Sequence, residues 1–209
     1  RNGADAVEGS YDEGLETGTW TAWYDDGVMA WRGSYDAGAQ TGTWTTFDSE
    51  GRELSRGSFV AGVQSGTWSI WSWQDGERIA TTGEVVAGRA SGPWVARFDP
   101  GGEPAGEVSY FDGSREGPST TRWRNGQTRS EGSYQADLPH GPWRFFYPNG
   151  ETFSEATFDA GVYEGDYHEY YDDGSPKAEG AYIDGAKTGT WTYWDEDGNA
   201  RSCQGDERC

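Results

Sequence analysis

The residues of this chain that could do acid–base or nucleophilic chemistry are few and scattered. His140 lies in the predicted turn LPHGPW, and His168 follows Tyr167 inside a predicted strand. A catalytic histidine needs a nucleophile and an orienting group within reach, and the neighbouring sequence offers neither. We therefore predict structural or surface roles for both histidines, no catalytic residues and no enzyme activity.

Paired carboxylates are abundant, as in Asp25-Asp26 and Asp172-Asp173. A glycosidase would need two special carboxylates that flank a cleft. Here equivalent carboxylates recur at predicted turns, where Asp supports the turn backbone. This recurrence favours a structural interpretation over hydrolysis of glycans.

The sequence predicts no metal and no cofactor. Asp195, Asp197 and Asn199 resemble the start of a calcium loop, but Gly198 is misplaced and no distal Glu follows at the required spacing. The glycines recur at the period of a repeat and not in the strand–loop–helix setting of a phosphate loop. The two cysteines have no adjacent His, so they do not make a zinc site.

Cys203 and Cys209 lie close together at the end of the chain, in the tail SCQGDERC. We expect them to form a small disulfide loop, with two free thiols as the alternative. A disulfide would place the protein outside the cytosol. The chain begins at Arg1, and we expect an extracellular or cell-surface protein from which a leader has been removed.

Most residues belong to a unit that recurs about every 24 residues, which is typical of a repeat architecture. Each unit opens with a Gly followed two residues later by an apolar or aromatic residue, as in Gly33/Tyr35 and Gly106/Val108, except that the seventh unit reads Ala156/Phe158. A second Gly precedes a large aromatic residue, as in Gly42/Trp44. An acidic or amide residue precedes a third Gly, as in Asp26-Gly27. We expect a lead-in at 1–7, eight repeats at 8–202 and a cysteine tail at 203–209.

The repeated Asp-Gly and Asn-Gly pairs predict β-hairpins with type I′ turns. In the first unit, strands are expected at 19–25 and 28–35, joined by a tight turn at Asp26-Gly27. A looser connection at 36–42 would lead to the next hairpin. Because Trp, Tyr, Phe and Thr favour strands, we predict an all-β fold. It would be an elongated antiparallel meander of about eight stacked β-hairpin repeats.

The composition constrains the core. A formal net charge of −20 with few aliphatic residues would ordinarily indicate disorder. However, the chain has 12 Trp and 12 Tyr, and each large ring can bury about 150–250 Å². We therefore predict a thin ladder of aromatic rings as the core.

The strand aromatics fall into two sets. The first set follows the second Gly of each unit by two residues. The second set comes three residues later, on the opposite face of a regular strand, although a bulge could bring the two together. We interpret the second set as an exposed stripe that binds a partner, with coverage by neighbouring rings as the alternative. Its members are Trp23, Phe47, Trp71, Phe146, Tyr170 and Trp194.

The segments GTWTAWYDDG (18–27) and GSYDAG (33–38), together with GPWRFFYPNG (141–150) and GTWTYWDEDG (189–198), resemble a known repeat. They are similar to the MORN-repeat variant of the YwqK-type antitoxin repeat family, over almost the whole chain. This resemblance implies a MORN-like array that binds proteins. Choline-binding cell-wall repeats are also similar to GTWTAWYDDGVM, but they are shorter and lack the Gly-x-Tyr-x-x-Gly element.

Acidic residues outnumber basic ones about twofold in both halves of the chain. Such a field repels phosphate backbones and anionic lipids, so we expect no nucleic-acid binding and no direct binding to anionic membranes. It suits a basic protein partner. The alternatives are solubility or adaptation to salt, since Lys177 and Lys187 are the only lysines.

One basic island goes against this trend, in a unit that also lacks its Trp. It consists of Arg115, Arg122, Arg124 and Arg129. Irregular repeats are often places where an array bends or binds. The alternative is a drifted repeat whose arginines pair with neighbouring carboxylates.

These observations favour a non-enzymatic scaffold that binds another protein, with antitoxin-like neutralisation of a basic toxin as its most specific form. A carbohydrate- or cell-wall-binding array is an alternative in which the aromatic stripe binds glycan. Another alternative is a structural surface protein that self-assembles through open sheet edges.

Overall fold

A computed structural model describes residues 6–205, and every regular element in this range is a β-strand. The all-β prediction is therefore confirmed. No helix in this range has the length and apolar character needed to cross a membrane. The chain divides after Gly102 into two compact units, the N-terminal unit and the C-terminal unit.

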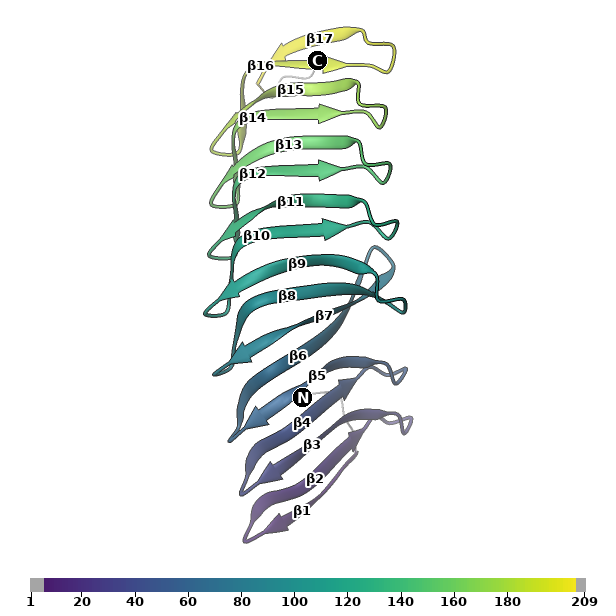
Figure 1. Cartoon of the computed structure of the whole chain (residues 1–209), viewed down its shortest axis with the longest axis vertical. Helices are drawn as coiled ribbons and strands as arrows, with labels where there is room; N and C mark the ends of the chain where they lie inside the picture. Colours follow the sequence, from purple (N-terminus) through teal and green to yellow (C-terminus); the bar gives the residue numbers. More distant parts are fainter. Residues whose placement is uncertain (1–5, 206–209) are drawn as a thin grey trace. The chain divides into compact units, whose positions relative to one another are not determined.

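The N-terminal unit contains eight strands: β1 (Ala6–Asp12), β2 (Leu15–Trp23), β3 (Met29–Asp36), β4 (Ala39–Phe47), β5 (Glu53–Val60), β6 (Val63–Gln74), β7 (Glu77–Val86) and β8 (Arg89–Asp99). The C-terminal unit contains nine: β9 (Pro104–Phe111), β10 (Ser114–Arg122), β11 (Thr128–Gln135), β12 (Leu138–Phe146), β13 (Thr152–Asp159), β14 (Val162–Tyr170), β15 (Pro176–Ile183), β16 (Ala186–Trp194) and β17 (Ala200–Gln204). Within each unit, consecutive strands pair antiparallel, which makes each unit a meander (Figure 1). β1 begins inside the expected lead-in, and β17 extends past Cys203.

The tight turns lie at the other end of the strands from where we predicted them. Ala37-Gly38, with φ of 46° and 79°, forms the two-residue turn between β3 and β4. Equivalent turns with two positive φ angles join each remaining odd strand to the next even strand. We call this side of each unit the turn edge.

The predicted tight turn at Asp26-Gly27 is a longer loop, so that prediction was wrong. Only Gly27 has a positive φ here, at 82°. Its amide donates to the Tyr24 carbonyl at 2.9 Å, and the Tyr24 amide donates to the Val28 carbonyl at 2.8 Å. This pattern is a type I turn followed by a left-handed glycine. Asp75-Gly76 is an exception, because both residues have positive φ. We call the side that carries these loops the loop edge.

Packing in both units depends on a tryptophan that lies on a glycine of the preceding strand. A Cβ built on Gly57 would lie 2.0 Å from Cδ2 of Trp68, and one on Gly33 would lie 2.1 Å from Cδ2 of Trp44. Six hairpins share this arrangement, and their indoles are all at most 8% exposed. The glycine is therefore required by close approach of an indole and not by its φ angle. The pairs are Gly9–Trp20, Gly33–Trp44, Gly57–Trp68, Gly83–Trp94, Gly132–Trp143 and Gly180–Trp191.

Two hairpins depart from this pair, and in both the sizes compensate. Ala156 lies opposite Tyr167, so a smaller ring faces a larger partner residue. Val108 lies opposite Ser119, so a branched side chain occupies the glycine position where the indole is missing. In the fifth unit Val108, and not Gly106, therefore occupies the position that the opening Gly has in the other units. The expectation from the sequence that Gly106 has this position was wrong. Gly106 is instead confined by the backbone, since a Cβ there would lie 2.5 Å from the Thr120 carbonyl oxygen.

The tryptophans are joined by tyrosine and phenylalanine rings from the odd strands. In the N-terminal unit, Tyr11, Trp20, Tyr35, Trp44, Phe59 and Trp68 form one continuous series. Neighbouring ring centroids are 5.1–5.8 Å apart, with edge-to-face angles of 68–89°. Such pairs each contribute about 0.5–1.5 kcal/mol beyond the area they bury. The predicted aromatic ladder is present.

We expect Gly57→Ala to lower the free energy of unfolding by about 3 kcal/mol, because the new methyl group overpacks the Trp68 ring. Trp68→Tyr in the same chain should offset part of this loss, because it reproduces the Ala156–Tyr167 pair. Urea unfolding of both single variants and the double variant gives the coupling energy. Strictly additive losses would contradict the size-compensation argument.

Candidate protein-binding faces

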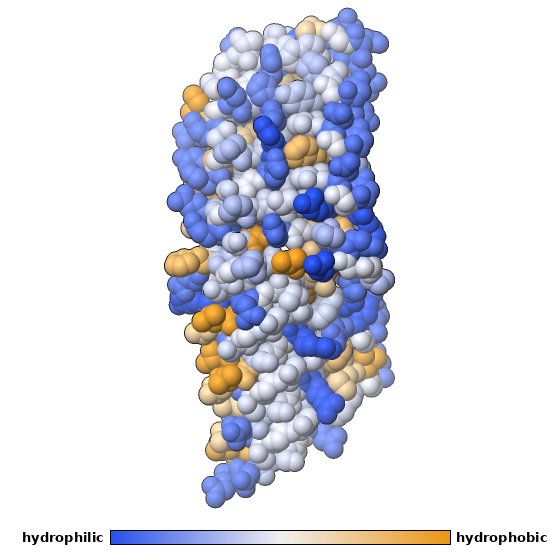
Figure 2. Space-filling view, in the orientation of Figure 1, coloured by the Kyte–Doolittle hydropathy of each residue, from blue (hydrophilic) through white to orange (hydrophobic). Residues whose placement is uncertain are grey.

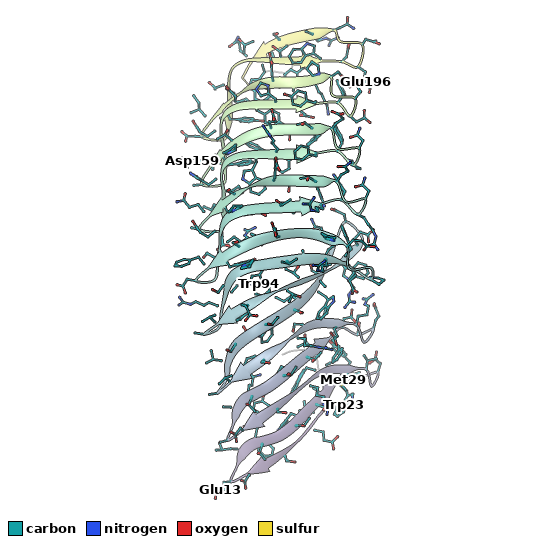
Figure 3. All side chains as sticks on the ribbon, viewed as in Figure 1. Glu13, Trp23, Met29, Trp94, Asp159 and Glu196 are labelled. Carbon is teal, nitrogen blue, oxygen red and sulfur yellow. The ribbon has the colours of Figure 1, made fainter. Side chains whose placement is uncertain are left out.

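Each sheet has two unlike faces, which follow from the alternation of side chains along a strand. The tryptophan face carries Trp20 and its equivalents, with Ala22 fully buried beside Trp20. The polar face carries the residues that alternate with these along each strand, such as Thr19 and Thr21. It also includes Trp23 at the loop edge. Figure 3 shows Trp23 and Met29 near the loop edge of the N-terminal unit and Glu13 at its turn edge.

The second aromatic set, which we expected to be exposed, is half-buried at each of its six positions. At Trp23, Phe47, Phe146 and Tyr170 one reason is a bulge. Ala22 pairs with Trp31 and Trp23 with Met29, so the partner strand contributes an extra residue there. Another reason is coverage by charged or aromatic neighbours. The Arg78 guanidinium lies 5.6 Å from the Trp71 ring, and the His168 ring lies 6.5 Å from Tyr170. Less aromatic surface is therefore available to a partner than we expected.

The most exposed indole is one that sequence reasoning did not select. Trp73 is 56% exposed at the end of β6, two residues beyond Trp71. The Arg52 guanidinium lies 5.3 Å from its ring. The signal in the sequence was the run WSIWSW, whose spacing of two places Trp71 and Trp73 on one face of a strand.

The central row of the polar face differs in charge between the two units. In the N-terminal unit it begins with Glu8, continues with Arg32 and Arg56 between threonines and serines, and ends at Val95. In the C-terminal unit the odd strands instead carry glutamates in register, three of them exposed and Glu155 half-buried. Sequence reasoning missed this row, although its members recur at the repeat period. They are Glu107, Glu131, Glu155 and Glu179.

Arg144 occupies one of the gaps between these glutamates. It lies on β12, directly opposite Glu131 on one side and Glu155 on the other. Its Nε atom is 3.0 Å from Glu155 Oε1, and its terminal nitrogen is 3.9 Å from Glu131 Oε1. A guanidinium therefore fits between two glutamates of this row with an ion pair on each side.

Both histidines lie among carboxylates on the C-terminal unit. His168 is half-buried and stands opposite Glu155 and Glu179 in the same row. His140 is exposed, and its Nδ1 lies 3.4 Å from Oδ1 of Asp159, which is exposed at the turn edge (Figure 3). The register of β11 and β12 also places Ser133 opposite His140.

The basic island is divided between the two edges of the C-terminal unit. Arg115 is near the turn edge, where its Nε lies 3.3 Å from Asp137 Oδ1 and its guanidinium lies 4.1 Å from the Tyr134 ring. The other three arginines lie around the loop edge, where Arg129 stacks 4.7 Å from the Trp123 ring. The four arginines therefore do not form one basic surface.

Hydrogen bonds from aromatic residues join the loops of successive repeats. The Tyr24 hydroxyl donates to the Phe47 carbonyl at 2.7 Å, and the Tyr147 hydroxyl donates to the Tyr170 carbonyl at 2.9 Å. Tyr171 and Trp123 make the same bond to the carbonyls of Trp194 and Phe146. Each of these bonds spans 23 residues, so the loop of one repeat is fixed by the next.

The acidic residues of the loops support turn backbones, as we predicted. The Asp195 carboxylate accepts the amides of Asp197 and Asn199 at 3.1 and 2.8 Å. These bonds account for the resemblance to a calcium loop. Within residues 6–205, no group of three His, Cys, Asp or Glu side chains is placed to hold a metal ion.

One carboxyl near the turn edge is linked to the neighbouring repeat. The Arg115 amide donates to Asp137 Oδ1 at 2.9 Å, and this bond lowers the pKa of the Asp137 carboxyl. The guanidinium of the same arginine donates to the Asp137 carbonyl at 2.7 Å. Asp137 itself has a φ of 70° in the tight turn between β11 and β12.

Cys203 is half-buried on β17, opposite Trp191. Cys209, its expected partner, lies outside the described residues. The disulfide between them therefore stays a prediction.

Comparison with known families identifies one of the repeats. Residues 139–160 match the family described as the MORN repeat variant, and this match supports a MORN-repeat protein. The matched segment contains an even strand, a loop and an odd strand, which are β12, the Tyr147–Glu151 loop and β13. No curated protein matches the chain.

We expect Tyr147→Phe to lower the free energy of unfolding by about 1 kcal/mol, because it removes the hydrogen bond to the Tyr170 carbonyl and leaves the ring in place. Tyr134→Phe is the matched control, since the Tyr134 ring packs on Trp143 by its edge. Denaturant unfolding of both variants measures the difference. Equal losses in the two variants would show that the loop bond contributes nothing of its own.

We expect the stabilisation from Asp137 to depend on pH. A lowered pKa in the folded state means that the contribution is complete above the ordinary carboxyl pKa of about 3.9. It is lost as the pH falls through the lowered folded value. Asp137→Asn should therefore destabilise the chain at neutral pH and have less effect in acid, while keeping the left-handed backbone conformation. Urea unfolding of both chains over a pH series gives the difference, and a pH-independent difference would contradict this account.

Proposed function

We propose that this protein is a non-enzymatic repeat scaffold that binds a basic protein partner on the polar face of its C-terminal unit. The observation that supports this proposal is the row of glutamates on β9, β11, β13 and β15. Alternate strands of a sheet are about 9.6 Å apart, so the row offers carboxylates at a regular spacing on one face.

Arg144 provides a local example of the proposed recognition. Its guanidinium is bracketed by Glu131 and Glu155. The gap between Glu107 and Glu131 contains the uncharged Thr120, and the gap between Glu155 and Glu179 contains His168. Arginine or lysine side chains of a partner, projecting at a similar interval, would lie in these gaps. There they would donate charge-assisted hydrogen bonds to the glutamates on either side.

The net charge of −20 adds long-range attraction for such a partner. Neutralisation of a basic toxin is the most specific form of this function, and it rests on the resemblance to the YwqK-type repeats together with this charge. A location outside the cytosol would be consistent with the expected disulfide. The half-buried second aromatic set favours protein binding over glycan binding, because stacking on sugars needs open ring faces.

The test is capture of basic proteins from an extract of the source organism by the immobilised chain, at low and at high salt. We expect one basic protein to be retained at low salt and released at high salt, because the attraction is screened. Replacing Glu107, Glu131 and Glu179 by Gln should abolish this capture, since these three exposed carboxylates line the row.

The matched control changes three exposed carboxylates at the two edges of the N-terminal unit, away from the central row, with Glu13→Gln, Asp26→Asn and Asp36→Asn. This variant has the same net charge as the first, so it separates the row from the general field of the protein. Capture that both variants reduce equally would mean that only net charge matters. Capture of glycan, or retention of the partner by the first variant, would contradict the proposal.

A further inference from the structure

The first strand of the N-terminal unit is an open sheet edge. All seven residues of β1 are exposed, and β1 pairs with β2 alone among the strands of its unit. Exposed edges with free backbone groups recruit other strands unless charge, proline or a bulge protects them. β1 contains no proline and no lysine, although it carries Glu8 and Asp12 and its register with β2 shifts between Glu8 and Ser10.

The side chains of β1 lack the cover that the same positions have further into the unit. Tyr35 on β3 lies between two indoles, with centroids 5.8 Å from Trp20 and 5.1 Å from Trp44. Tyr11 on β1 contacts Trp20 at 5.1 Å and remains 63% exposed, and Val7 is 52% exposed. Both side chains lie on the tryptophan face.

The hairpin geometry determines which backbone groups of β1 point outward. Asp12 and Leu15 flank the two-residue turn Glu13-Gly14, so they form a hydrogen-bonded pair. The direction of the backbone N–H and C=O groups alternates from one residue to the next along a strand. Those of Val7, Gly9 and Tyr11 therefore face away from β2. The equivalent residues Gly33 and Tyr35 of β3 use these groups to pair with Trp20 and Gly18.

We propose that two copies of this chain associate through β1, which pairs antiparallel with β1 of the second copy in a two-fold symmetric dimer centred on Gly9. In this register the outward groups of Gly9 face their own equivalents, and Val7 of each copy lies opposite Tyr11 of the other. The interface therefore adds backbone hydrogen bonds and two apolar cross-strand pairs.

Charge selects this register from its neighbours. Shifting the centre to Glu8 places Glu8 opposite itself, and shifting it to Ser10 places Glu8 opposite Asp12. Both shifts create like-charge pairs, which destabilise antiparallel strands. A centre on Gly9 places Glu8 opposite Ser10 and Asp12 opposite Ala6, with no opposed carboxylates. A register centred between two residues would place a residue whose backbone groups face the second copy opposite one whose groups face β2, so the two could not form hydrogen bonds.

The experiment is sedimentation equilibrium of the intact chain over a concentration series at low and at high salt. We expect the mass to rise from 22.9 kDa towards twice that value with concentration. The dimer should be favoured by high salt, because salt screens the repulsion between two acidic chains. Capture of a basic partner has the opposite salt dependence, so failure of either proposal can be recognised separately.

Ser10→Glu places two like-charge pairs across the interface and should raise the dimer dissociation constant on the order of 10-fold. Ser10→Gln is the matched control of the same size and should have little effect. The double variant Glu8→Lys/Ser10→Glu makes both pairs opposite in charge and should restore the dimer. Unfolding of each variant checks that exposed Ser10 is replaced without loss of the fold. A chain that stays monomeric, or a dimer indifferent to Ser10→Glu, would overturn the proposal.

Discussion

The close approach of an indole to a backbone without a side chain is the interaction on which both units depend. A sheet a single layer thick has no second layer to bury its apolar side chains against, so each tryptophan lies on its own sheet. It can do so only where the preceding strand has a glycine, as at Gly57 beneath Trp68. The substitutions at Ala156–Tyr167 and Val108–Ser119 show that the constraint concerns volume.

The two edges of each unit hold neighbouring repeats together by different means. At the turn edge, backbone amides of one turn donate to carbonyls of the preceding repeat, as Gly38 does to Glu16 at 2.9 Å. At the loop edge, the bonds come from aromatic side chains such as Tyr24. Figure 2 shows apolar side chains gathered along the turn edge of the N-terminal unit, which includes exposed Val60, Val63 and Val86. Because these contacts join adjacent repeats, each repeat depends on its neighbours for stability.

The tryptophan face is similar in both units, since packing determines it, whereas the polar face is free to vary. Its central row carries arginine at positions 32, 56 and 144 and glutamate at positions 8, 107, 131, 155 and 179. Substitutions there leave the indole–glycine contacts unchanged. A repeat of this kind can therefore change the charge of its polar face without changing its fold, as the proposed binding role of that face requires.

The sequence alone determined the repeat period, the all-β class and the first aromatic set as the core. The reason is that large rings and glycines that recur at one period can pack against each other in only a few ways. It also indicated that the loop carboxylates support turns.

The tertiary structure decided which pair of residues ending in Gly forms the tight turn. Asp26-Gly27 and Ala37-Gly38 are both compatible with a tight turn, and it is the observed register, with Asp36 opposite Ala39, that places the two-residue turn at Ala37-Gly38. Tertiary structure also decided that the second aromatic set is half-buried, because bulges such as that opposite Trp23 depend on the pairing of two strands. It brought the glutamates of separate repeats into one row, because residues that are distant in sequence become neighbours only through strand register.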